Sequence, residues 1–401
     1  MQLVLPVALA VALAPVAVAV YGYILYPLLL WVIGHRRAGL PTVDDANWNW
    51  PSVTITVPVY NAADRIERTL ESLLQTDYPA DRLQILVLSD ASTDATDEIV
   101  RSFASRGVQL WRAPERRGKT SIENAAVPIA RGEIIVNVDA TVEVPSSSLK
   151  KLLSVFADTT VGVASGRDVS VGASNTSGGE STYVRFEMRV RDLETRVGSI
   201  VGASGCFFAI RRSIHDRPLP NDLSWDFASA MVARTKGYRS VSVADAICVV
   251  PSSGQVHAEL RRKARTMTRG LKTLFHFREV MNPFRYGSFA LMLISHKLCR
   301  WLPYLIAPFS LIAWIYIGSQ YAILGSLLGF GIALSVAAYG FAHRGHKLPR
   351  ALAWTTFATA SFVAGSLAWY DALRGARTAV WNPTDRSRAA MAVASSSTRL
   401  S

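Results

Sequence analysis

The sequence is poor in cysteine, with three in 401 residues. These are Cys206, Cys248 and Cys299, and the long intervals between them exclude a disulfide framework. The same spacing excludes a metal site built on closely spaced cysteines. Low cysteine usage is compatible with a reducing compartment.

Acidic residues are fewer than basic ones, 30 against 43, and the formal charge is +13. A basic balance fits nucleic acid, a membrane surface or an anionic small substrate. Half of the residues are apolar, and they gather at the two ends of the chain. Because these runs are long enough for a membrane, membrane lipids and an anionic substrate are the expected partners, and nucleic acid is not.

Charged residues are absent from Val4 to Ile33, a segment long enough to span a bilayer. No basic residue precedes it, so a cleaved signal peptide is not expected. His35, Arg36 and Arg37 follow directly, and the positive-inside rule then places the chain from residue 35 onward in the cytoplasm. We therefore expect a transmembrane helix within residues 1–35 of an integral membrane protein.

After a polar linker over residues 36–52, runs rich in β-branched residues alternate with helical patterns. Strands are expected at 53–59, 84–90, 108–112 and 134–138. The helices between them are expected to begin near Asn61, near Thr93 or Asp94, and at Lys119. Single helices between strands imply right-handed βαβ units, so the sequence predicts an α/β fold with a mostly parallel sheet.

Polar residues follow three of these strands, at Tyr60-Asn61, Ser89-Asp90 and Asp139. In open α/β sheets, ligands bind at the edge formed by the carboxyl ends of the strands. A carboxylate at the border of a core is costly unless something binds it. Asp139 is therefore either a helix-capping acid or a ligand-binding acid.

Residues 160–250 have a less regular pattern. It indicates a loop over 172–182, a helix from Tyr183 to Val197, a strand over 206–210 and a helix opened by Asp226. Residues 257–277 then form an amphipathic helix whose basic face holds Arg261, Arg262, Arg265, Arg269 and Lys272. Such a helix either lies in the membrane interface or turns its basic face toward a phosphate.

The carboxyl-terminal part has three further apolar segments, Trp301–Ile317, Tyr321–Phe341 and Leu352–Tyr370. We assign interfacial helices to 257–299, transmembrane helices to 300–373 and a basic disordered tail to 374–401. Three spans would place that basic tail outside, against the positive-inside rule, so one of the segments is expected to be interfacial or re-entrant.

Three stretches, VPVYNAADRIERTLESLL, LSDASTDAT and VNVDATVEVP, together resemble the family 2 glycosyltransferases. These are inverting enzymes with the GT-A fold, and the resemblance extends over about residues 50 to 275, with the GT-A domain placed at 53–256. The membrane-flanked layout looks like the processive cellulose, chitin-oligosaccharide, hyaluronan and poly-N-acetylglucosamine synthases.

The resemblance implies a membrane-bound hexosyltransferase that moves a sugar from a nucleoside-diphosphate sugar to a glycan or lipid acceptor. Among such donors, a UDP-sugar is the first expectation. It implies surface polysaccharide or glycolipid synthesis at a bacterial inner membrane, with the catalytic domain in the cytoplasm. Two alternatives stay open: a single-addition glycolipid transferase, and a catalytically degenerate GT-A scaffold that partners another synthase. A transporter is disfavoured because the apolar segments contain few polar residues.

The resemblance assigns donor-binding roles to several residues. Asp90 matches the acid that contacts the nucleoside, or else it caps the following helix. Pro58 and Tyr60 match the donor-binding loop, or else reflect plain turn chemistry. Lys119 either neutralises phosphate or is a solvated loop lysine.

Asp139 matches the first acid of the family's Asp-x-Asp motif, while Thr141 replaces the second, which is normally the metal ligand. The resemblance implies Mg²⁺ or Mn²⁺ at Asp139. Three possibilities follow: the ion is completed by the diphosphate and water, divalent dependence is weakened, or the protein is a degenerate member.

On the acceptor side, Asp226 matches the base that takes the proton of the acceptor hydroxyl, or else it is an N-cap. Trp225 and Gly205 are placed beside it as acceptor-binding residues, or else Gly205 is simply part of a turn. Arg262 matches the arginine of the Gln-x-x-Arg-Trp motif, which binds diphosphate. Lys263 replaces the tryptophan of that motif, and an ammonium cannot stack on a sugar as an indole does.

Overall fold

The structure is a computed structural model that describes residues 4–37, 40, 48–171, 178–251, 256–343 and 349–375. The chain divides into two compact units. An α/β unit is formed mainly by Leu30–Gln255 and Lys272–Met292, and a helical unit by Met1–Leu29, Val256–Leu271 and Leu293–Ala376. Most of the predicted linker and nearly all of the predicted disordered tail lie outside the described residues.

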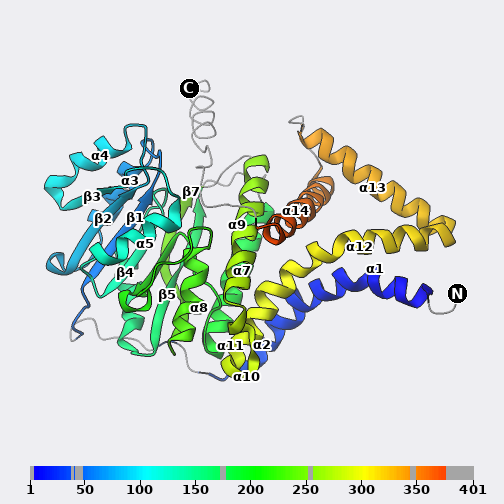
Figure 1. Ribbon diagram of the computed structural model, residues 1–401, viewed down its shortest axis with the longest axis horizontal. Helices are drawn as coiled ribbons and strands as arrows, with labels where there is room; N and C mark the ends of the chain where they lie inside the picture. Colours follow the sequence, from blue (N-terminus) through cyan, green and yellow to red (C-terminus); the bar gives the residue numbers. More distant parts are fainter. Residues whose placement is uncertain are drawn as a thin grey trace. The chain divides into compact units, whose positions relative to one another are not determined.

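The α/β unit is built on a seven-stranded sheet in the order β3-β2-β1-β4-β6-β5-β7 (Figure 1). Its strands are β1 (Val53–Val59), β2 (Leu83–Ser89), β3 (Val108–Arg112), β4 (Ile134–Val138), β5 (Val161–Val171), β6 (Phe207–Arg211) and β7 (Arg239–Pro251). β6 pairs antiparallel with both neighbours, and the other pairs are parallel. The predicted α/β class and its mostly parallel sheet are confirmed.

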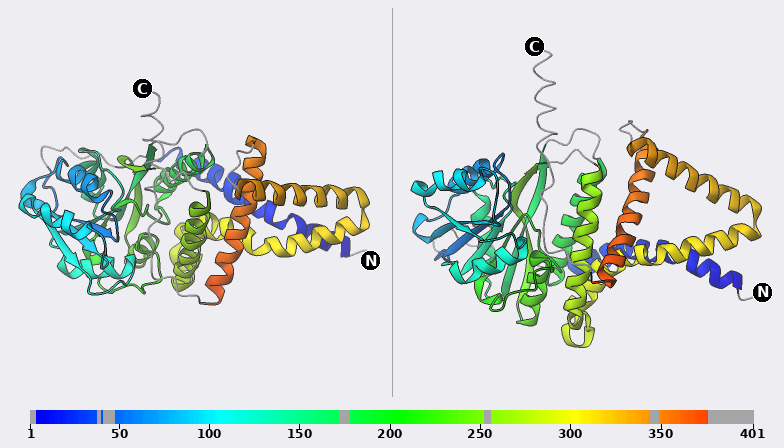
Figure 2. Two further views of the ribbon diagram at one scale, coloured as in Figure 1. Left: turned by 90° about the horizontal axis from the view of Figure 1, so that it is seen from above. Right: turned by 45° about the horizontal axis from the view of Figure 1, so that its top comes forward.

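Helices cover both faces of this sheet (Figures 1 and 2). They are α3 (Ile66–Leu74), α4 (Thr96–Ser102), α5 (Lys119–Ile129), α6 (Ser148–Ser154), α7 (Gly178–Val197) and α8 (Trp225–Thr235). Apolar side chains of α3, α4 and α6 share one core with Val57. Those of α8 pack with Ile135 and Phe208, and those of α5 with Leu88. Because successive strand residues point to opposite faces, the central strands are apolar throughout.

The sequence did not predict β5 and β7, the two longest strands. They pair in parallel with register shifts between Val161 and Val163 and between Ser165 and Arg167. Such irregularities break the period-2 alternation by which a strand is recognised. Gly166 lies at the second shift, where an added Cβ would be 2.5 Å from Phe207 Cδ1 and 2.8 Å from a carbonyl oxygen. A larger residue would force this part of the sheet apart.

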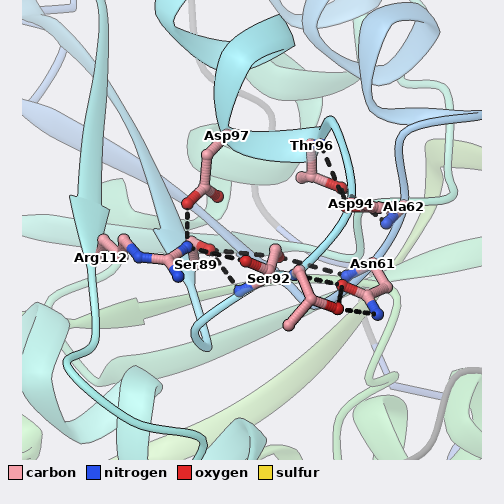
Figure 3. A network of polar contacts seen from close by, with 9 residues as sticks. Asn61, Ala62, Ser89, Ser92, Asp94, Thr96, Asp97 and Arg112 are labelled. Carbon is pink, nitrogen blue, oxygen red and sulfur yellow. Dashed lines mark hydrogen bonds and ion pairs between the residues drawn. The ribbon is translucent and has the colours of Figure 1, made fainter.

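Two helices begin later than expected, because the polar residues before them bind other loops (Figure 3). Asn61 does not cap α3, which begins at Ile66. Asn61 has φ of 48°, and its side-chain oxygen accepts the Thr93 N–H at 2.8 Å. α4 begins at Thr96, after Asp94, whose Oδ2 accepts the N–H of Ala63 in the loop after β1 at 3.2 Å and whose Oδ1 accepts the Thr96 N–H at 3.0 Å. The Asn61 side chain thus ties the loop after β1 to the loop after β2.

The helical unit contains α1 (Val4–Val20), which lies along α12 (Cys299–Gln320), with α13 (Ala322–His343) and α14 (Arg350–Leu373) beyond it (Figure 2). Ala12 is buried against Ala313 and Ile317, and Ser310 Oγ donates to the Ala12 carbonyl oxygen at 2.7 Å. Small residues at such contacts allow close backbone approach, as is typical of helices packed in a membrane.

By length and composition, three helical stretches among the described residues can span a membrane: Val4–Gly34, Ser288–Gln320 and Ala322–Phe341. The first three predicted apolar segments are thereby confirmed as candidate spans. The fourth, Leu352–Tyr370, lies within α14, which is not among the three. The remaining helices are α2 (Tyr26–Gly34), α9 (Val256–His276), α10 (Pro283–Tyr286) and α11 (Ser288–Leu293).

Two phenylalanines in the α/β unit provide a matched test of the core. Phe208 on β6 is fully buried, whereas Phe284 is 99% exposed. We expect Phe208→Ala to lower the free energy of unfolding by about 3–5 kcal/mol, because it removes buried contacts and leaves a cavity. The same change at Phe284 is expected to fall within about 0.5 kcal/mol of wild type. Thermal unfolding of the detergent-solubilised chain measures both, and equal effects would contradict the assignment of Phe208 to the core.

Candidate functional site

Two acids follow parallel strands at the same edge of the sheet. Asp90 comes directly after β2, and its N–H donates to the carbonyl oxygen of Val59 at 2.8 Å. Asp139 comes directly after β4, and its N–H donates to the carbonyl oxygen of Cys206 at 3.0 Å. Because β1, β2 and β4 are parallel, their carboxyl ends open at one edge, as expected for a ligand site.

Asp90 anchors the loop that precedes α5. Its carboxylate oxygens accept the N–H of Arg117 at 2.7 Å and the N–H of Gly118 at 2.9 Å. These bonds satisfy a carboxylate that is only 3% exposed. Gly118 has φ of 92°, a conformation that glycine adopts without steric cost. The acid therefore fixes the start of α5 and does not cap α4, which begins at Thr96.

The two residues predicted to form a donor loop differ in position. Tyr60 lies at the end of β1 and is partly exposed, and the guanidinium carbon of Arg116 is 3.8 Å from the centroid of its ring. Pro58 is buried within β1 and pairs with Leu88 of β2. At this edge Tyr60 therefore offers a partly exposed side chain, whereas Pro58 is part of the sheet.

Lys119, the first residue of α5, connects the acids of the site. Its Nζ donates to Asp139 Oδ1 at 2.5 Å and to the Gly205 carbonyl oxygen at 3.3 Å, and it lies 3.8 Å from Glu123 Oε1. Burial alone would lower its pKa, but the carboxylates of Asp139, Glu123 and Asp226 raise that pKa above its ordinary value. Lys119 is thus not a solvated loop lysine but lies among carboxylates, which favour its charged form.

Asp226 lies in the first turn of α8 and approaches Gly205 closely. Its Oδ1 accepts a hydrogen bond from Ser224 Oγ at 2.6 Å, and Ser224 is the N-cap residue, so Asp226 does not have that role. A Cβ added at Gly205 would lie 3.0 Å from Asp226 Oδ2. Together with the electrostatic effect of Asp226 on Lys119, this contact brings four predicted residues into one cluster: Lys119, Asp139, Gly205 and Asp226.

Trp225, which we expected beside the acceptor, lies in the core instead. It is 2% exposed and stacks on His215, with ring centroids 4.2 Å apart and an interplanar angle of 19°. Its Nε1–H donates to Asn124 Oδ1 at 3.3 Å. Consecutive residues on a helix point in different directions, so Asp226 reaches the cluster while its neighbour turns inward.

Arg262 lies in α9, but its side chain is outside the described ones, so its predicted contact with diphosphate stays a prediction. Within the described part of the chain, no group of three or more His, Cys, Asp or Glu side chains is arranged to hold a metal ion. The metal role predicted for Asp139 stays a prediction, and Lys119 binds one of its oxygens.

Sequence reasoning missed Asp168 and Ser204. Ser204 Oγ lies 2.7 Å from Asp168 Oδ1 and 2.8 Å from Oδ2, just before Gly205. Desolvation raises the pKa of Asp168, whereas the Ser204 hydroxyl and the Arg191 charge act to lower it. Asp168 belongs to β5, which has irregular register, so no periodic signal in the sequence distinguished this acid from a surface residue.

The fold is that of the GT-A class. A solved mannosyltransferase from Pyrobaculum calidifontis, in complex with GDP-Man and Mn²⁺, superposes with a TM-score of 0.70 at 23% identity. The alignment covers 93% of this chain and 100% of that one. Residues 54–217 match the family model for Glycosyl transferase family 2, and the chain therefore carries a domain of that family.

Curated relatives carry glycosyltransferase names. An N-acetylglucosaminyltransferase of Rhizobium sp. (strain N33) is 26% identical over 234 residues, 54% of this chain and 52% of that protein. The beta-monoglucosyldiacylglycerol synthase of Synechocystis sp. is 28% identical over 127 residues, 31% of this chain and 26% of that protein. The chain spans about half the length of the first curated relatives it matches.

The stack of His215 on Trp225 predicts a pH-dependent stability. Burial, followed by the charge of Lys236, lowers the pKa of His215 from 6.5 to about 3. Below pH 6.5, His215 binds a proton in the unfolded chain but stays neutral in the folded chain. Stability is therefore lost as the pH falls toward 3. Between pH 6.5 and 4.5 we expect the free energy of unfolding of the wild type to fall by on the order of 2–3 kcal/mol more than that of His215→Phe.

Thermal unfolding of both proteins across this pH range measures the difference. His276→Phe is the control, because His276 is exposed, and its pH dependence should follow that of wild type. Parallel curves for wild type and His215→Phe would contradict a buried neutral imidazole.

Proposed function

We propose that the chain is a membrane-bound inverting glycosyltransferase that moves a sugar from a nucleoside-diphosphate sugar to a glycan or lipid acceptor. The observation that carries the proposal is the cluster in which the Lys119 ammonium binds Asp139, with Asp226 beside it. The family domain and the names of the curated relatives support sugar transfer. The three candidate spans support a membrane location, with the domain on the cytoplasmic side.

In this proposal the donor binds across the edge of the sheet between Asp90 and Lys119. Tyr60 and Asp90 border the nucleoside, next to the backbone amides of Arg117 and Gly118 that Asp90 holds. The Lys119 ammonium faces the diphosphate. Its positive charge stabilises the negative charge that develops when the bond from the sugar to the diphosphate breaks.

A divalent ion fits this site only in part. Mg²⁺ is commonly held by one or two carboxylates together with substrate phosphates, and Asp139 supplies one carboxylate. The described residues provide no further cluster of ligands, so diphosphate oxygens and water would complete the coordination. When bound, such an ion adds positive charge at the leaving diphosphate.

Asp226 is the proposed general base. Ser224 binds its Oδ1, which leaves Oδ2 directed toward Gly205, where the absence of a side chain lets the carboxylate approach the turn closely. The acceptor hydroxyl loses its proton to Asp226, and its oxygen bonds to the anomeric carbon on the face opposite the departing diphosphate. The configuration at that carbon is therefore inverted.

Replacement of the base tests this function. Asp226→Asn is expected to lower kcat by about 10²–10⁴-fold with the donor KM little changed, because the amide cannot accept the proton. Radiolabelled UDP-, GDP- and TDP-sugars offered to the full chain in membranes, with products separated by size, measure transfer and distinguish single addition from polymerisation. The control is Asp216→Asn, an exposed acid that pairs with Lys236. An inactive wild type would favour the degenerate scaffold suggested by Thr141, and an active Asp226→Asn would contradict the assigned base.

Chelation tests the cation. We expect EDTA to lower activity and Mn²⁺ or Mg²⁺ to restore it, since one oxygen of Asp139 remains beside the diphosphate. Asp139→Asn should raise the half-activating metal concentration about 10–100-fold. Asp77→Asn, which changes an exposed acid paired with Lys150, is the control and should leave the metal titration unchanged. Full activity in EDTA would leave Lys119 as the cation that neutralises the diphosphate.

A further inference from the structure

The turn Ser204–Cys206, which leads into β6, touches both halves of the proposed site. The Gly205 carbonyl oxygen accepts from Lys119 Nζ at 3.3 Å, and the Cys206 carbonyl oxygen accepts the Asp139 N–H at 3.0 Å. An added Cβ at Gly205 would stand 3.0 Å from Asp226 Oδ2. A shift of this turn would therefore move the donor-side pair relative to the proposed base.

Two residues of β5 hold this turn in place. Ser204 Oγ lies within hydrogen-bond distance of both carboxylate oxygens of Asp168, at 2.7 and 2.8 Å. The same hydroxyl oxygen accepts the N–H of Cys206 at 3.3 Å. The N–H of Ser204 donates to Ser165 Oγ at 2.8 Å. Asp168 is thus linked through one hydroxyl to the backbone of the residue that binds Asp139.

The environment of Asp168 makes a carboxyl group costly there. Desolvation raises its pKa, and the nearby charge of Asp139 acts in the same direction. The Ser204 hydroxyl and the Arg191 guanidinium oppose this effect, and the Cys248 thiol lies 3.5 Å from Oδ1. A buried carboxyl group is stable only when it is hydrogen-bonded, and the shortest hydrogen bonds of Asp168 are those with Ser204 in the Ser204–Cys206 turn.

We propose that Asp168 is a positioning residue for sugar transfer: through Ser204 it fixes the Ser204–Cys206 turn, and with it the placement of Asp226 relative to the Lys119–Asp139 pair. This inference rests on the proposed function. Because Asp90 and Tyr60 contact a different loop, loss of Asp168 should disturb the reacting geometry more than the contacts with the nucleoside, so kcat should fall more than the donor KM rises. Small displacements of reacting groups lower rates strongly, by about 10²-fold for 1 Å.

A double-mutant cycle tests the proposal on the full chain in membranes. Asp168→Ala and Ser204→Ala are each expected to lower kcat about 10–100-fold, with the donor KM within about twofold of wild type. The double variant should be no slower than the more impaired single variant, because both changes break the same link. Asp168→Asn keeps an oxygen that accepts from Ser204 and should recover most of the lost kcat.

Ser242→Ala is the matched control. It removes a serine hydroxyl that donates to a second acid of the same unit, Asp192, at 3.0 Å. It should lower stability about as much as Ser204→Ala while leaving kcat at the wild-type value. An equal fall in kcat for Ser242→Ala would show a general effect of stability and would overturn the proposal.

The remaining outcomes separate the two levels of inference. An active wild type whose kcat is unchanged in Ser204→Ala, or singles whose effects multiply in the double variant, would overturn the role of Asp168 alone. A wild type that transfers no sugar from any donor would overturn the proposed function and this role with it. If Asp168→Ala does not fold, Ser204→Ala and Asp168→Asn decide the question. A lowered kcat in Ser204→Ala together with a kcat near the wild-type value in Asp168→Asn supports the role of Asp168. Any other pattern contradicts it.

Discussion

The ion pair between Lys119 and Asp139 is the contact on which the site depends. The Lys119 and Asp139 side chains are only partly exposed, 25% and 34%, so their mutual attraction and further polar interactions offset the cost of withdrawing the two charges from part of their water. Gly205, Glu123 and Asp226 provide those further interactions. Asp90 contributes indirectly, since it fixes the backbone immediately before Lys119. Asp139, which follows β4, and Asp226, in the first turn of α8, therefore share one cation, while Asp90, which follows β2, holds the backbone next to it.

The sheet explains why such distant residues meet. Parallel strands place Asp90 and Asp139 at one edge, and β6, which runs antiparallel, begins at that same edge opposite the end of β4. The turn before β6 therefore arrives beside the residues that follow its neighbours. A fully parallel sheet would have put this turn at the other end of the strands.

Much of the sheet and part of the candidate site were predictable from the sequence, for identifiable reasons. The strands that carry Asp90 and Asp139 are short apolar runs bounded by polar residues, and they were placed within a residue of their observed ends. β5 and β7 were missed because register shifts interrupt their alternation. Trp225 was misplaced because a motif gives position along a helix, whereas side-chain direction depends on packing against His215. Asp168 lies on β5, so its position near the site could not be predicted while that strand was missed.

The antiparallel strand also determines how the site is distributed along the polypeptide. The residues proposed to bind the donor, Asp90, Lys119 and Asp139, come before β6, and Asp226, the proposed base, comes after it. The family match ends at residue 217, before that last acid. A fragment cut at this boundary would keep Asp90, Lys119 and Asp139 but lose Asp226, Arg262 and strand β7, so the matched segment alone holds only part of the proposed site.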